Sequence, residues 1–165
     1  MAVEMFVKLD GITGGSRNYY HKGWSDVLSW SWSLERVHGV SPGASDNMRM
    51  NELSLIKAIG IDSPAMMTAF AEGKPIKQVD LSIVPMVGKR DAQQKYVTIT
   101  LEDVLIKSII TGGSAEESFF RENLTLCFGK IKYEFHQYAD VGSDGGAATL
   151  KSFAFGWDVA ANAAT

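Results

Sequence analysis

The sequence has 165 residues, a formal net charge of −3 and a charged fraction of 21%. A chain of this length forms one domain and buries enough apolar surface to fold without a disulfide or a metal. Its basic residues are scattered, which excludes nucleic acid as a partner, and no apolar run reaches the roughly 20 residues that span a membrane.

The first ten residues alternate as a β-strand does. The apolar positions on one side of this strand are Val3, Met5, Val7 and Leu9. Glu4 and Lys8 are charged and no basic segment precedes an apolar run, so this is not a signal peptide. We expect a protein made in the cytoplasm that, if exported, leaves by a route that accepts the folded chain.

The next apolar run also has a period of two. The even positions hold Trp24, Leu28, Trp30, Trp32 and Leu34, and the odd positions hold Val27, Ser29, Ser31 and Ser33. This pattern predicts one strand with tryptophans on one face and serines on the other. Because buried tryptophans contribute large apolar areas, we expect the tryptophan face to point into the core.

Residues 38–47 have the composition of a loop, which is long for a connection between strands. A strand resumes near Asn51, with Leu53 and Leu55 on one face. One helix follows: Asp62 or Ser63 caps it, Pro64 suits its first turn and Gly73 ends it. Its apolar side, predicted to pack on a sheet, holds Met66, Met67 and Phe70.

Further strands are predicted at 77–87, 95–110, 118–138 and 149–158. Two of them change phase, the first between Leu101 and Val104 and the second at Gly129. A phase change in a long strand indicates a β-bulge or sharp bend, which lets a sheet curl into a barrel or pass into a second sheet. The fold class expected is mainly β: two curved antiparallel sheets that form a barrel or sandwich, with one helix at the side, in a single domain over 1–165.

No catalytic, cofactor or metal site emerges from the residues. The three histidines are far apart in sequence, the glycine pairs lack a phosphate-loop ending, and Cys127 is expected to be a buried core thiol. We therefore expect no enzyme and no cofactor. The alternative class is a monomeric carbohydrate- or ligand-binding β-module that uses Trp30 and Trp32 as an exposed platform.

The whole chain, in order, resembles the haemolysin-coregulated protein (Hcp) family of type VI secretion. The resemblance is carried by the opening strand with Gly14-Gly15-Ser16 and by five later runs. These are Val27-Leu28-Ser29-Trp30-Ser31-Trp32, Leu101-Glu102-Asp103-Val104-Leu105-Ile106, Thr111-Gly112-Gly113-Ser114, Glu122-Asn123-Leu124-Thr125-Leu126 and Phe155-Gly156-Trp157-Asp158. The tail after Asp158 is short, and we expect no toxin domain to be fused there.

This resemblance implies a ring of six copies, and rings that stack into a hollow tube. The implied partners are the chain itself, small effector proteins inside the ring, a spike protein and a contractile sheath, with no membrane insertion. It also implies assembly in the cytoplasm, then export without a signal peptide. The loop is expected to reach an adjacent ring or protomer through Gly39, Val40, Ser41, Pro42, Gly43, Ala44, Ser45 and Asp46.

In such a ring, the serine face has a further use. A lumen has to be polar and must release its cargo, and small hydroxyls satisfy both conditions. We therefore expect Ser29, Ser31 and Ser33 to line the lumen and contact effectors.

Overall fold

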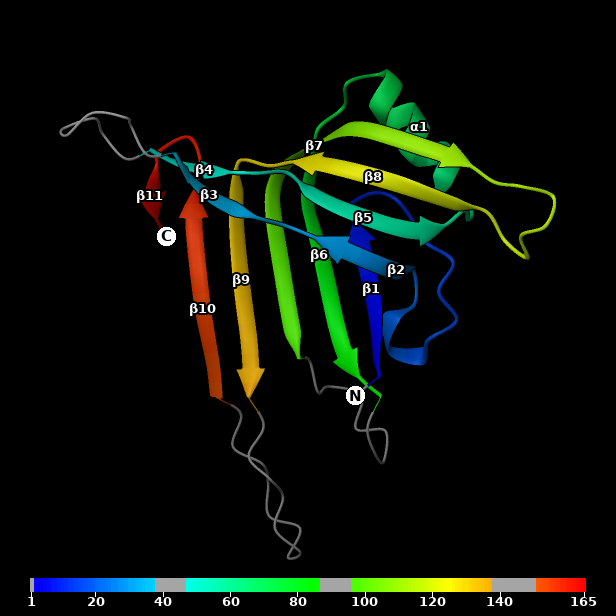
Figure 1. The fold of residues 1–165 in the computed structure, drawn as a ribbon, viewed down its shortest axis with the longest axis horizontal. Coiled ribbons are helices and arrows are strands. Elements are labelled where there is room, and N and C mark those ends of the chain that lie inside the picture. The colour runs from blue at the N-terminus through cyan, green and yellow to red at the C-terminus, as the bar shows by residue number, and fades with distance from the viewer. Residues whose placement is uncertain (1, 38–46, 87–95, 138–150) are drawn as a thin grey trace, which may run out of the picture.

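The structure, a computed structural model, describes residues 2–37, 47–86, 96–137 and 151–165. Its elements in chain order are β1 Val3–Leu9, the 3-10 turn η1 Tyr19–His21, β2 Ser25–Ser31, β3 Leu34–Val37, β4 Asn47–Met50, β5 Leu53–Ala58, α1 Ser63–Ala71, β6 Ile76–Pro85, β7 Val97–Gly112, β8 Arg121–Cys127, β9 Lys130–Gln137, β10 Lys151–Asp158 and β11 Ala163–Ala164. The mainly β class with one α-helix is therefore confirmed (Figure 1).

Six antiparallel strands close into a barrel in the order β7-β6-β1-β2-β5-β8, with β8 returning to β7. Closure depends on the length of β7, which pairs with β6 and β9 in its first half and with β8 in its second. Asp103 has a positive φ of 53°, and the register shifts between Ile106 and Ser108. The predicted phase change is thus confirmed as the bend that carries one strand between two sheets.

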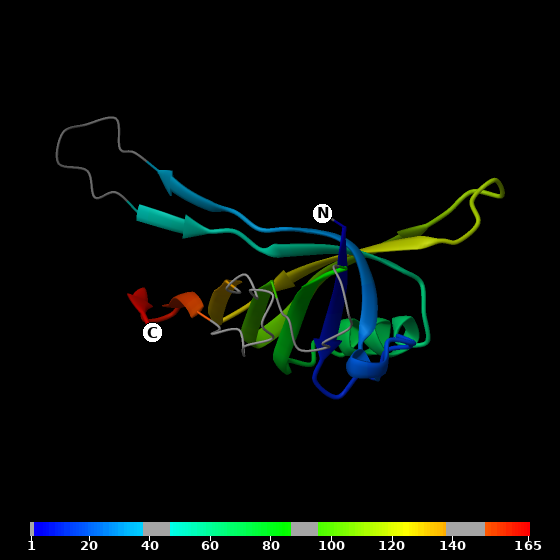
Figure 2. The same cartoon turned by 90° about the horizontal axis from the view of Figure 1, so that it is seen from below.

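The second predicted phase change is a sharp turn. The expected strand over 118–138 is two strands, β8 and β9, which separate at Gly129. The Gly129 amide donates to the Glu102 carbonyl at 2.9 Å, and this bond fixes the turn against the bend in β7. Strand β9 then joins β10 and β11 in a wing that continues the sheet past the barrel (Figures 1 and 2).

Apolar side chains from every barrel strand fill the interior. Leu55, Ile99, Leu124 and Leu126 are at most 1% exposed, as the period-two pattern of their strands requires. Aromatic side chains cover the wing on the same side: Tyr133, Phe135, Phe155 and Trp157 pack against this core. The core is therefore continuous from the barrel into the wing.

Helix α1 begins after Asp62, has Pro64 in its first turn and ends before Gly73, which has a φ of 62°, as predicted. The expected apolar side is only partly correct, because Met66 is fully buried while Met67 and Phe70 are 40% and 46% exposed. The helix lies on the side of the barrel away from strands β3 and β4 (Figure 2).

A buried ionic network anchors the helix to the barrel. The Lys57 ammonium on β5 lies 2.6 Å from a Glu122 carboxylate oxygen on β8 and 3.1 Å from Asp62. Ser25 donates to Asp62, and Ser63 donates to Glu122 at 2.9 Å. Since Lys57, Asp62 and Glu122 are all at most 2% exposed, each charge depends on the others for compensation.

The segment that leaves the barrel after β2 forms a separate two-stranded ribbon of β3 and β4 (the β3–β4 ribbon). It projects from the barrel on the side of β2 and β5 (Figure 2). The predicted loop over 38–47 is one residue too long, because Asn47 begins β4. The remaining residues of that loop, 38–46, lie outside the described part of the chain.

Candidate cargo and assembly surface

The three predicted serines are all exposed. Ser29 and Ser31 lie on β2, and Ser33 follows its end, where its hydroxyl accepts a hydrogen bond from the Asn51 side chain at 2.8 Å. Trp30 and Trp32 are half-buried and pack against the core. The serines and the tryptophans are therefore on opposite faces, although the strand ends at Ser31 and does not continue to Leu34.

The predicted phase of the strand is wrong at its start. Val27, expected beside the serines, is 6% exposed and belongs to the core, whereas Leu28, expected beside the tryptophans, is 42% exposed. The cause is a register shift between Val27 and Ser29, a β-bulge against β5 that reverses the alternation. Leu34 is also 44% exposed because it belongs to the projecting ribbon.

The serine face continues across the neighbouring strands. In the registers of the sheet, Ser31 pairs with Ser54 of β5, Ser54 with Thr125 of β8, and Thr125 with Ser108 of β7. We call Ser31, Ser54, Thr125 and Ser108 the hydroxyl row. Paired residues point to the same side of a sheet, so four hydroxyls from four strands share one face.

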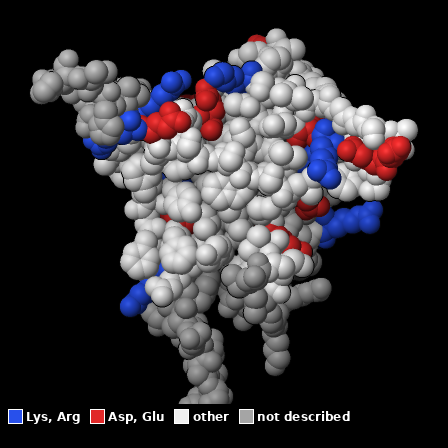
Figure 3. Space-filling model, viewed as in Figure 1, with Lys and Arg blue, Asp and Glu red and all other residues white. Residues whose placement is uncertain are grey.

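This outer face of β2, β5 and β8 has few charges at its centre. Figure 3 looks onto it and shows the charged side chains gathered toward its two ends. Cys127, expected to be a core thiol, is half-buried because it alternates with the fully buried Leu126 and so belongs to this outer side. At one end of the face, Lys107 forms an exposed ion pair with Glu52. The hydrogen bond from Lys107 lowers the pKa of Glu52, and Glu52 raises the pKa of Lys107.

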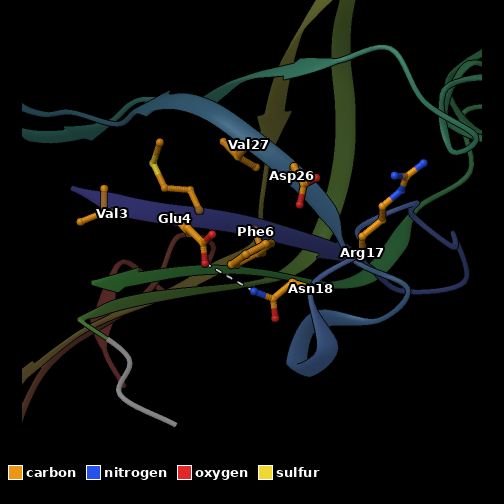
Figure 4. A pocket seen from close by; sticks show the side chains of 8 residues that line it. Val3, Glu4, Phe6, Arg17, Asn18, Asp26 and Val27 are labelled. Carbon is orange, nitrogen blue, oxygen red and sulfur yellow. Dashed lines mark hydrogen bonds between the residues drawn. The ribbon is translucent and has the colours of Figure 1, made fainter. Parts of the chain in front are cut away.

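A hollow of about 380 Å³ opens where β1 and β2 separate (Figure 4). The strands pair there only at Phe6 with Asp26 and at Val7 with Ser25. The lining residues are Val3, Glu4, Met5, Phe6, Arg17, Asn18, Asp26 and Val27. Asn18 donates to the Glu4 carboxylate at 3.4 Å. The lining has no hydroxyl, thiol or imidazole, and its ionisable groups are the carboxylates of Glu4 and Asp26 and the Arg17 guanidinium.

The described part of the chain shows neither a metal site nor a membrane-spanning helix. No group of three or more His, Cys, Asp or Glu side chains there could hold a metal ion. Among residues 2–37, 47–86, 96–137 and 151–165, no helix has the length and apolar character needed to cross a membrane. Of the two tryptophans that the alternative ligand-binding module would use, Trp32 lies near Tyr133 and Phe155, with ring centroids 6.4 Å away in each case, and both tryptophans are half-buried against the core.

The eight residues expected to make inter-ring contacts, Gly39, Val40, Ser41, Pro42, Gly43, Ala44, Ser45 and Asp46, lie outside the described residues. The structure does describe the β3–β4 ribbon, whose two strands precede and follow these residues. Sequence reasoning did not identify the hydroxyl row beyond Ser31 or the network around Lys57. Both depend on strand registers, which no local pattern contains.

Comparison with known proteins agrees with this geometry. Residues 6–135 match the family described as "Type VI secretion system effector, Hcp". Protein hcp1 of Pseudomonas aeruginosa is 34% identical over 166 residues, which covers 98% of each chain. The crystal structure of Hcp1 from Salmonella typhimurium superposes with a TM-score of 0.77 at 27% identity, over 100% of both chains. A type VI secretion system effector from Yersinia pestis does so with 0.67 at 26% identity, over 94% of this chain and 99% of that one.

Proposed function

This chain belongs to the Hcp family of type VI secretion proteins, and we propose that it serves there as a structural subunit of a hollow tube. Six copies form a ring, and rings stack head to tail. Small effector proteins travel in the lumen, a spike protein caps the tube, and a contractile sheath surrounds it. The protein is assembled in the cytoplasm and exported with its cargo. Its role is structural and not catalytic.

The observation that carries this proposal is the hydroxyl row. A lumen wall has to be wide, polar and weakly adhesive, so that cargo enters and later leaves. Four short hydroxyl side chains on adjacent strands give such a surface, since each forms only modest hydrogen bonds in competition with water. The uncharged centre of the same face favours cargo of either net charge (Figure 3).

The residues around the row support the same assignment. Ser29 precedes the row on β2 and is exposed, and its partner on β5 is the half-buried Ile56. A small polar side chain and a half-buried apolar one therefore lie beside the row. Ser33 lies beyond the strand, and its hydroxyl is already engaged by Asn51, so we assign it to the margin of the lumen.

The loop over 39–46 serves in this proposal as a contact between neighbouring rings or protomers. It connects the two strands of the β3–β4 ribbon, whose register from Leu34 with Met50 to Val37 with Asn47 directs the chain away from the barrel. The projection of the described ribbon from the barrel supports this role (Figure 2).

Ser31→Arg tests the cargo surface, with Ser152→Arg on β10 as the matched control because Ser152 is exposed on a different part of the sheet. We expect both variants to fold and to form rings by native mass spectrometry. Only Ser31→Arg should lose co-purification or export of small effectors. If Ser31→Arg instead dissociates the ring while effector binding persists, Ser31 belongs to a subunit interface and the lumen assignment is wrong.

A further inference from the structure

The hollow between β1 and β2 combines a rigid apolar floor with ionisable groups at its rim. Phe6 and Val27 belong to the floor and are 4% and 6% exposed. The Phe6 ring is fixed in place because it is stacked on the His21 imidazole, with ring centroids 4.0 Å apart. The volume of about 380 Å³ lies in the range of pockets that hold small molecules. The floor therefore offers a preformed surface to the apolar stem of a ligand.

Two carboxylates flank the Phe6 ring. Asp26 is the partner of Phe6 across the two strands, so both side chains point to the same side of the sheet. Glu4 precedes Phe6 by two residues on β1 and therefore points to that side as well. Positions in the diagonal relation of Glu4 and Asp26 are about 7–8 Å apart. A ligand with two positive groups can span this separation across the ring (Figure 4).

The third ionic group, the Arg17 guanidinium, comes from the connection between β1 and β2. This connection is held against the start of β2, because the Ser16 amide donates to the Trp24 carbonyl at 2.8 Å. The next residue, Asn18, donates to the Glu4 carboxylate at 3.4 Å. Arg17 lies between these two anchored residues and lines the hollow. In Figure 4, Arg17 and Asp26 lie toward one end of the hollow and Glu4 toward the other.

The ionic groups of the hollow are available to a ligand. Within the described residues, no ion pair or side-chain hydrogen bond engages Arg17 or Asp26, and Glu4 accepts only the long bond from Asn18. Two carboxylates and one guanidinium give the lining a net charge of −1. A matching ligand carries two positive groups, one negative group and an apolar stem.

We propose that this hollow binds a free basic amino acid, of which lysine is the simplest. The α-carboxylate binds the Arg17 guanidinium, whose planar fork fits a carboxylate, and the α-ammonium binds Asp26 beside it. The four-carbon stem crosses the Phe6 ring, and the ε-ammonium reaches Glu4 at the far end. The net charge of +1 on lysine then balances the lining. This site is separate from the hydroxyl row, and the proposal does not depend on the tube.

A series of ligands tests which groups the site recognises. Isothermal titration calorimetry of the full chain with L-lysine is compared with three analogues that each lack one ionic group: cadaverine, Nα-acetyl-L-lysine and L-norleucine. We expect each analogue to bind about tenfold more weakly, because each leaves one charged group of the site without its partner. Equal binding of cadaverine would indicate a site for simple diamines. Equal binding of Nα-acetyl-L-lysine would indicate a site for the terminal lysine of a protein chain. Either result overturns the proposal.

Three substitutions pair with these analogues. Glu4→Gln, Arg17→Gln and Asp26→Asn should each weaken lysine binding about tenfold, and the fold should persist because all three side chains are exposed. Each variant should leave one analogue unaffected, the one that lacks the group it binds: norleucine for Glu4→Gln, cadaverine for Arg17→Gln and Nα-acetyl-L-lysine for Asp26→Asn. Glu102→Gln, at an exposed acid on β7, is the control and should change nothing. Absence of lysine binding to the wild-type chain at about 10 mM, or equal losses with the control, would refute the site.

Discussion

Removal of the buried cation Lys57 is the sharpest test of how the helix is joined to the barrel. Lys57→Met keeps a long apolar stem but leaves Asp62 and Glu122 buried without their shared positive charge. All three side chains are at most 2% exposed, so water cannot replace the lost partner. Among the residues that the structure describes, Glu122 Oε2 has no hydrogen-bond partner, so few other contacts can compensate the charge of this carboxylate.

The expected cost follows from these contacts. Breaking a buried ion pair by removing one partner destabilises a protein by about 3–5 kcal/mol. That is a large share of the roughly 5–15 kcal/mol by which a domain is stable. At about 2–4 °C per kcal/mol for a chain of this size, the midpoint of thermal unfolding should fall by about 6–20 °C. Urea unfolding followed by tryptophan fluorescence measures the same loss as a change in midpoint.

Two further variants separate charge from packing. The triple variant Lys57→Met, Asp62→Asn, Glu122→Gln removes every charge of the network and should recover much of the lost stability, because no uncompensated ion remains. Lys107→Met breaks the Glu52–Lys107 pair, whose side chains are 36% and 56% exposed, and should have a far smaller effect. If Lys57→Met is no more destabilising than Lys107→Met, the network does not anchor the helix and this reasoning is wrong.

The remaining predictions concern the bulge, the exposed ion pair and the loop. Val27→Ser should lower the free energy of unfolding by about 2 kcal/mol and Leu28→Ser should change it little; the reverse order in urea unfolding would refute the bulge. In NMR titrations, Lys107→Met should raise the pKa of Glu52 toward its ordinary value, because the lowering comes first from the Lys107 hydrogen bond. Deleting residues 39–46 should leave the fold and ring mass intact and abolish tube growth and secretion; unimpaired secretion would contradict the role of the loop.

The sequence predicted those parts of the fold that depend on local patterns. Alternation placed Leu53 and Leu55 on one face, which the structure buries, because neighbouring side chains of a strand point to opposite faces. The change of parity between Leu101 and Val104 marked the bend of β7, since both residues are buried although their positions differ by an odd number, three. Pro64 and Gly73 marked the ends of the helix, where each satisfies a specific backbone requirement.

Local sequence patterns predicted the candidate site only in part. Period two separated Ser31 from the tryptophans, and that assignment needed no partner strand. At Val27 and Leu28 the same rule failed, because a bulge forms where β2 meets β5 and is a property of the pair of strands. The lining of the hollow between β1 and β2 likewise depends on where two strands separate.

Tertiary structure alone decided the rest. Local sequence patterns predict that a charged residue such as Lys57 is exposed to solvent. It is buried because Asp62 at the helix start and Glu122, 65 residues away in sequence, bring carboxylates to its ammonium group. The hydroxyl row exists only because register aligns Ser31, Ser54, Thr125 and Ser108 across four strands. Burial of charge and alignment of side chains are both set by which strands pair, and pairing is decided by the closed barrel as a whole.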